Sequence, residues 1–191
     1  MVVSGRTRQL FEDIRAAGFM SEGHYEFRSG MHALKLLDRD RLLSDPHLAS
    51  RMGYALAKHF FLLRVDYVAT PSIWGAGLAQ WVGYFLEPRK PIVYSFVKDG
   101  EIIFSTGPEK LDGKRVLVID NLILTGKTMT EFVRSLTAAE ATPIAVGSLA
   151  DLSGVEFPIQ TYGLLNEHMD VFHPDRNPEM GKDIPVTKVP Y

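Results

Sequence analysis

The sequence predicts an α/β protein with a doubly wound, mostly parallel sheet of five strands. Short apolar segments begin near positions 65, 92, 116, 144 and 160, and helical patterns separate them. Strands that alternate with helices are typical of a parallel sheet, because each crossover between parallel neighbours needs a long connection. The run VLVI at 116–119 is continuously aliphatic, which indicates a strand buried on both faces.

The composition narrows the class of protein. The chain has 191 residues, 46% of them apolar, which is enough for one domain with a real core. Its net charge of −2 argues against a nucleic-acid partner. Cysteine is absent, so disulfides, thiolate nucleophiles and cysteine metal sites are excluded. We find no signal peptide in the first ten residues, and the richest apolar run, 54–63, is too short to span a membrane. A cytoplasmic protein without a membrane partner is expected.

The first half of the chain predicts two helices, a hairpin and one strand with its following helix. Residues 6–17 have an amphipathic pattern, and residues 19–37 alternate in the manner of a short hairpin. Asp45 followed by Pro46 is typical of a helix start, because an aspartate caps the first turn and proline fits the first helical position. A strand at 65–70, a small-residue loop at 71–77 and a helix through residue 86 come next.

The second half continues the alternation. A strand at 91–97 precedes a polar, glycine-containing segment at 98–111, in which residues 101–106 alternate and are compatible with a hairpin arm. A helix begins near residue 128, and strands at 144–150 and 159–165 follow it. The tail, 172–191, is rich in proline and charge, and we expect no regular structure there.

The stretch Val116–Thr128, VLVIDNLILTGKT, carries the functional hypothesis. A buried strand leads through Asp120 and Asn121 into the loop Thr125-Gly126-Lys127-Thr128 and then into a helix. Main-chain N–H groups and the helix dipole at such a turn favour an anion. The two polar residues at the strand's end can bind hydroxyls beside it. The pattern therefore indicates a ribose phosphate, although a generic βα turn is the alternative interpretation.

This stretch resembles the thirteen-residue phosphoribosyl-pyrophosphate motif of the type I phosphoribosyltransferases, in which four apolar and two acidic residues precede T-G-x-T. Asn121 is the one position that departs from the motif. The segment around His24, Ser29-Gly30 and His32 is similar to the N-terminal hood of orotate phosphoribosyltransferases, and I-P-V at 184–186 is similar to their C-terminal segment. The resemblance covers residues 19–189, and Leu152 stands where those enzymes carry a base-binding arginine.

The resemblance implies transfer of a 5-phosphoribosyl group from phosphoribosyl pyrophosphate to a nucleobase, in pyrimidine nucleotide biosynthesis if the base is orotate. Asp120, Asn121 and Lys98 are the implied catalytic residues, the first two at the ribose diol. Arg28 would reach the base or the pyrophosphate from the hood. The remaining implied contacts are Thr125, Gly126, Lys127 and Thr128 for the 5′-phosphate, and Ser72, Ile73, Trp74 and Gly75 for pyrophosphate. For Trp74, a packing or dimer contact is favoured over a catalytic role.

The resemblance also implies a Mg²⁺ ion bound through pyrophosphate and ribose hydroxyls, with no confident protein ligand, and a homodimer. We expect a single domain in which 19–37 and the tail 166–191 form a hood and 45–165 form the core. Asn121, Leu152 and a catalytic loop at 98–111 with few cations depart from the family pattern. Two alternatives to orotate transfer therefore stay open: a regulatory protein that binds the ligand without turnover, and a transferase for another base.

Overall fold

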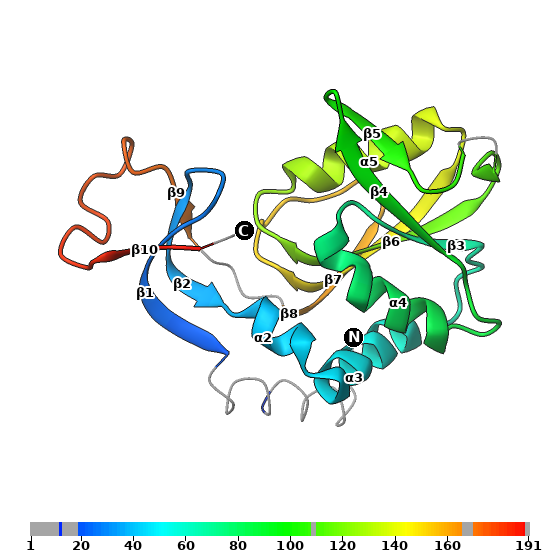
Figure 1. Cartoon of the computed structure of the whole chain (residues 1–191), viewed down its shortest axis with the longest axis horizontal. Coiled ribbons are helices and arrows are strands. Elements are labelled where there is room, and N and C mark those ends of the chain that lie inside the picture. The colour runs from blue at the N-terminus through cyan, green and yellow to red at the C-terminus, as the bar shows by residue number, and fades with distance from the viewer. Residues whose placement is uncertain (1–11, 13–18, 108–109, 166–169, 190–191) are drawn as a thin grey trace. The chain divides into compact units, whose positions relative to one another are not determined.

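The computed structural model describes residues 12, 19–107, 110–165 and 170–189, and the helix expected over 6–17 lies outside them apart from Glu12. The chain divides into two compact units, one formed by 1–42 with 168–191 and the other by 43–167. Each unit is built around its own sheet (Figure 1).

The first unit contains a four-stranded sheet in the order β10-β1-β2-β9. Strands β1 (Met20–Glu26) and β2 (His32–Leu37) form the predicted antiparallel hairpin. Strand β9 (Val171–Phe172) pairs with β2, and β10 (Val186–Lys188) pairs with β1. The expectation of no regular structure in the tail was therefore wrong at these two strands. They are too short to show a period, and their hydrogen-bonding partners lie far away in the sequence.

A pair of buried histidines ties the tail to this hairpin. His24 Nδ1 lies 2.9 Å from the carbonyl oxygen of Gly181, and His24 Nε2 lies 2.7 Å from His32 Nδ1. Because a carbonyl oxygen only accepts, His24 Nδ1 carries a hydrogen and, in the neutral pair, its Nε2 accepts from His32. A side chain at Gly181 would meet the His24 ring, and the positive φ of Gly181 (72°) also favours glycine.

The second unit contains a six-stranded sheet in the order β5-β4-β3-β6-β7-β8. Five strands lie where the sequence predicts them and run parallel: β3 (Tyr67–Thr70), β4 (Ile92–Lys98), β6 (Arg115–Ile123), β7 (Thr142–Asp151) and β8 (Gln160–Leu165). The sixth strand, β5 (Glu101–Phe104), pairs antiparallel with β4. Asp99 and Gly100 both have positive φ, 53° and 83°, as a two-residue hairpin turn requires. The segment 101–104 is thus the arm of a hairpin.

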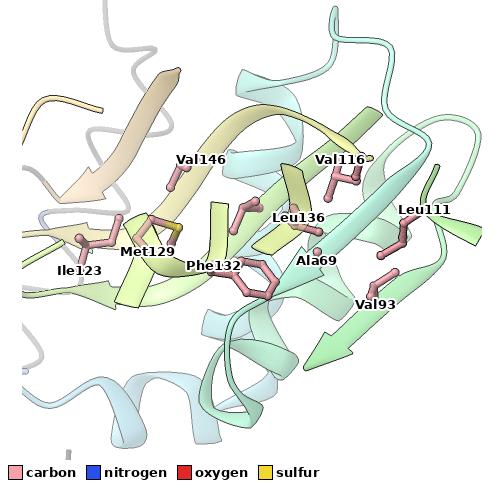
Figure 2. Close-up of a cluster of buried hydrophobic side chains, with 11 residues drawn as sticks. Ala69, Val93, Leu111, Val116, Ile123, Met129, Phe132, Leu136 and Val146 are labelled. Atoms are coloured by element: carbon pink, nitrogen blue, oxygen red, sulfur yellow. The ribbon is translucent and has the colours of Figure 1, made fainter. Parts of the chain in front are cut away.

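Helices cover both faces of this sheet. α3 (Pro46–His59) begins as predicted, with Asp45 accepting hydrogen bonds from the N–H groups of His47 and Leu48. α3 packs against α4 (Ala76–Phe85), and Phe60, just after α3, lies close to Gly147 of β7. α5 (Lys127–Ala138) places Phe132 in the cluster that contains Val118 and Val146 (Figure 2). Phe60 lies beside Gly147 together with Ile119. Val118 and Val146 contact the α5 side, and the next residue in each strand, Ile119 or Gly147, lies on the Phe60 side. Because adjacent residues of a strand face opposite sides of the sheet, α5 and α3 cover opposite faces.

The strand order reverses beside β3. The chain runs outward from β3 to β4, and then returns to place β6 on the other side of β3 before continuing to β7 and β8. Ligands of open α/β sheets bind at such a reversal, outside the carboxyl ends of the strands. The chain leaves the sheet after Thr70, whereas β6 continues past its pairing with β3 as far as Ile123, with Asp120 and Asn121 still in the strand.

A buried serine at β7 generates a stability prediction. Ser148 has no exposed surface, and its Oγ has no hydrogen-bond partner within the described part of the chain. Replacing it with alanine removes an unsatisfied hydroxyl, so Ser148→Ala should raise the free energy of unfolding by about 1 kcal/mol in urea titration. Ser95→Ala is the matched control and should lower it, because Ser95 Oγ donates to the Thr70 carbonyl. A loss of stability in Ser148→Ala would contradict this assignment.

His59 predicts how stability depends on pH. Its ring stacks on Tyr162 with centroids 3.6 Å apart, and burial lowers the pKa of His59 below 6.5. Below pH 6.5 the imidazole of His59 is therefore protonated to a greater extent in the unfolded chain than in the folded chain. The free energy of unfolding consequently falls as the pH falls. His59→Phe keeps the stacked ring and should reduce the loss of stability between pH 7.5 and 5, measured by urea titration at each pH. His47→Gln, at an exposed position, is the control, and equal losses in all three proteins would refute the prediction.

Candidate functional site

The first turn of α5 offers main-chain donors. The first helical hydrogen bond runs from Thr130 N to Gly126 O at 2.9 Å. The N–H groups of Lys127, Thr128 and Met129 precede it and have no acceptor among the described residues. Gly126, in the left-handed conformation with φ 74°, turns the chain into the helix. The exposed Thr125, Lys127 and Thr128 surround these donors, so the turn can bind an anion with main-chain and hydroxyl groups.

Two polar side chains lie close to this turn, at the carboxyl end of β6. Asp120 is 8% exposed, and its Oδ1 accepts a hydrogen bond from Asn121 N at 2.8 Å. Asn121 is 1% exposed, and its Nδ2 donates to the carbonyl oxygen of Trp74 at 3.1 Å. A carboxylate beside an anion site can hold hydroxyl groups of the same ligand, while the asparagine amide contacts the neighbouring loop.

That loop, 71–75, links β3 to α4 and contains the short 3-10 turn Ile73–Gly75. Thr70 Oγ1 donates to Ser72 O at 3.0 Å, and Ser95 Oγ donates to Thr70 O at 3.1 Å. Gly75 packs so tightly that an added Cβ would overlap Thr70 Oγ1 and lie 3.0 Å from Asp120 Oδ1. The loop after β3 and the end of β6 therefore form one packed arrangement.

Three further residues that the sequence analysis singled out lie on other elements of the fold. Lys98 ends β4 and is exposed on the β4–β5 hairpin. Arg28 is exposed in the turn between β1 and β2 of the first unit. Leu152 is buried, and its N–H donates to Ile123 O at 2.9 Å. Its side chain packs inside the protein and offers no charge to a ligand.

A cavity of about 790 Å³ adjoins the two loops. Its lining includes Pro71 of the β3–α4 loop, Thr128 of α5, and residues of the β4–β5 hairpin such as Val97 and Ile102. The hairpin, predicted only as a polar segment with an arm, thus borders the same region as the anion-binding turn. This volume lies in the range of small-molecule sites.

Sequence analysis placed Thr70 at the ligand-binding edge of the sheet without a role, and it missed Ser95. Both are buried polar residues near the ends of apolar strands, and their hydroxyls hold the main chain of the loop from beneath. The signal in the sequence was a hydroxyl residue within an otherwise apolar strand. Buried hydroxyls are nearly always hydrogen-bonded, so each of them predicted a main-chain partner, but not which one.

The described residues contain no group of three or more His, Cys, Asp and Glu side chains that could hold a metal ion. Among the helices of the described residues, none is long and apolar enough to cross a membrane.

Comparisons with known proteins identify the class. The fold is that of the type I phosphoribosyltransferases, as shown by the Mycobacterium tuberculosis orotate phosphoribosyltransferase solved with inorganic phosphate. The two share 18% identity and a TM-score of 0.62, over 84% of this chain and 95% of that one. No protein-family model matches the chain.

Relatives with curated names narrow this further. The orotate phosphoribosyltransferase of Caldicellulosiruptor saccharolyticus is 28% identical over 184 residues, 94% of this chain and 93% of that protein. An orotate phosphoribosyltransferase of Thermus thermophilus is 32% identical over 145 residues, 76% of this chain and 79% of that protein. The chain belongs to the orotate phosphoribosyltransferase family.

Gly75 of the β3–α4 loop and Gly77 in the first turn of α4 give a matched test of this packing. Gly75→Ala should destabilise the protein by about 1–3 kcal/mol, because the new methyl group overlaps Thr70 and crowds Asp120. Gly77→Ala should be neutral or stabilising, since nothing lies within 4 Å of its added Cβ and alanine favours the helix. Urea titration of both variants measures the difference, and equal effects would show that the loop is not packed as described.

Proposed function

We propose that this protein transfers the 5-phosphoribosyl group of phosphoribosyl pyrophosphate to a ring nitrogen of orotate, with release of pyrophosphate. Family membership supports the reaction class. The single observation that supports the site is the packing of Gly75 against Asp120 at the reversal of strand order, with the main-chain donors of the α5 turn following Asp120 in the chain.

In this proposal the 5′-phosphate is bound by the first turn of α5. The N–H groups of Lys127, Thr128 and Met129 donate to its oxygens, and the hydroxyls of Thr125 and Thr128 add donors. Lys127 Nζ lies 4.0 Å from Glu131 Oε1 at an exposed position, so this ion pair is weak and leaves the ammonium able to turn toward a phosphate.

The ribose and the pyrophosphate occupy the neighbouring surfaces. Asp120 holds the ribose hydroxyls, with Asn121 beside it, and fixes the sugar while positive charge develops at its anomeric carbon. The main chain of Ser72–Gly75, with Ile73 and Trp74, faces the pyrophosphate, and Lys98 approaches from the hairpin. Fixed donors at the departing group stabilise its growing negative charge.

A Mg²⁺ ion fits this donor set. Asp120 provides a carboxylate at the site, and Mg²⁺ is commonly bound by one or two carboxylates together with phosphate oxygens of the substrate. When bound, it neutralises charge on pyrophosphate.

We also propose a homodimer located in the cytoplasm, in which exposed Tyr54 and Tyr84 supply apolar surface for a second copy. Within the single-domain organisation proposed from the sequence, Arg28 contacts the base or pyrophosphate from the hood.

A second candidate function is binding of phosphoribosyl pyrophosphate or a nucleotide without turnover. The buried Leu152 and a hairpin whose described residues carry the one cation Lys98 favour it, because a carboxylated base and a leaving pyrophosphate both need positive charge. A coupled assay for pyrophosphate release separates the two functions. Release that depends on orotate supports the transferase, and binding without release for any nucleobase supports the sensor. Release with a different nucleobase would assign another base.

The ribose assignment predicts the behaviour of Asp120→Ala. Phosphoribosyl pyrophosphate at about 100 times its Kd should stabilise the wild-type chain by about 2.7 kcal/mol, and Asp120→Ala should lose most of this stabilisation. Thermal unfolding with and without ligand measures the effect, and the unliganded midpoint checks the fold of each variant. Asp112→Ala, at an exposed turn, is the control. Undiminished stabilisation in Asp120→Ala would refute the ribose assignment.

A further inference from the structure

Asn121 stands at the position where the family motif carries its second acid, and it makes a contact that an ionised acid cannot make. Its Nδ2 donates to the main-chain carbonyl of Trp74 at 3.1 Å, across 47 positions of the sequence. Asn121 is 1% exposed, so its amide needs a hydrogen-bond partner within the protein. The amide thereby connects the end of β6 to the 3-10 turn of the β3–α4 loop.

The chemistry of the two groups decides which side chains are compatible with this contact. A carbonyl oxygen only accepts hydrogen bonds, and an ionised carboxylate also only accepts. An aspartate at position 121 would place a buried anionic oxygen against the Trp74 oxygen, which repels it and leaves both without a donor. A protonated aspartate could donate to the same oxygen. The contact therefore distinguishes an amide or a neutral acid from a carboxylate.

The rest of the loop shows why this bond matters. Its first half is held by side chains from beneath, through Thr70 Oγ1 to Ser72 O, and Gly75 N donates to Ser72 O at 3.2 Å. The side chains of Ile73 and Trp74 are 71% and 50% exposed, so burial contributes little to holding the middle of the loop. The hydrogen bond that the Asn121 amide donates to Trp74 O restrains the main chain in the middle of the loop.

We propose that Asn121 is a positioning residue, which holds the main chain of 72–75 in one conformation before any ligand binds. Compared with an acid at position 121, Asn121 removes one negative charge near the ribose and adds a hydrogen bond that preorganises the loop. Asp120 alone supplies the carboxylate. The consequence for pyrophosphate binding rests on the proposed function, whereas the hold on the loop does not.

Tryptophan fluorescence tests the hold on the loop directly. The chain has two tryptophans, so Trp81→Phe leaves Trp74 as the only one, and its half-exposed ring reports on the loop. We compare this parent with the same chain carrying Asn121→Asp or Asn121→Leu, and measure acrylamide quenching between pH 4.5 and 8.5. Circular dichroism at each pH confirms that all three proteins are folded.

Asn121→Asp should match the parent at acid pH, where its carboxyl group donates to Trp74 O. Quenching should then rise as the carboxyl group ionises, with a midpoint above the ordinary aspartate value of about 3.9 because the site is buried. Asn121→Leu, of similar size but without a donor, should show raised quenching at every pH, and the parent should show no such transition. Quenching equal to the parent in Asn121→Leu, or no pH dependence in Asn121→Asp, overturns the proposal.

Calorimetric titration with magnesium pyrophosphate separates this inference from the proposed function. If both are right, Asn121→Asp loses affinity for pyrophosphate over the same pH range in which quenching rises, relative to the parent. If quenching changes as expected while pyrophosphate affinity follows the parent, the hold on the loop is supported and the assignment of 72–75 to pyrophosphate is overturned.

Discussion

The pairing of β3 with β6 is the constraint on which the candidate site depends. These strands are not consecutive, yet their parallel register, Val68 with Leu117 and Ala69 with Val118, puts their carboxyl ends at one edge. The loop that follows Thr70 and the polar pair at 120–121 meet only because of this register. A sheet in which β4 lay between them would double the separation of these segments, from one strand spacing of about 5 Å to two.

Burial of polar groups at this edge has a physical cost that the structure offsets locally. Thr70, Ser95 and Asn121 each donate to a main-chain carbonyl, and Asp120 accepts from the main chain. Such bonds contribute modestly to net stability, but a missing partner would be expensive. The polar groups consequently stiffen the loop, and Ser148, on the neighbouring strand, shows by contrast what a buried hydroxyl without a partner looks like.

The site relies on dipoles more than on charged side chains. The donors of the α5 turn and the loop main chain are fixed groups that need no rearrangement when a ligand arrives, and this is the form of electrostatic stabilisation that enzymes use most effectively. Few cations stand among the described residues here, and Leu152 is buried. We therefore expect a ligand of this site to be bound chiefly through phosphate oxygens and hydroxyls.

The sequence by itself determined the five parallel strands, the capped start of α3, the hairpin of 19–37 and the turn that begins α5. These follow from periodicity and from residues that act on their own neighbours, as Asp45 and Gly126 do. Only the tertiary structure decided the partner of Asn121, the histidine bond to Gly181, and the pairing of Val186–Lys188 with β1. Each of these joins segments far apart in the chain, where a local pattern carries no information about which donor meets which acceptor.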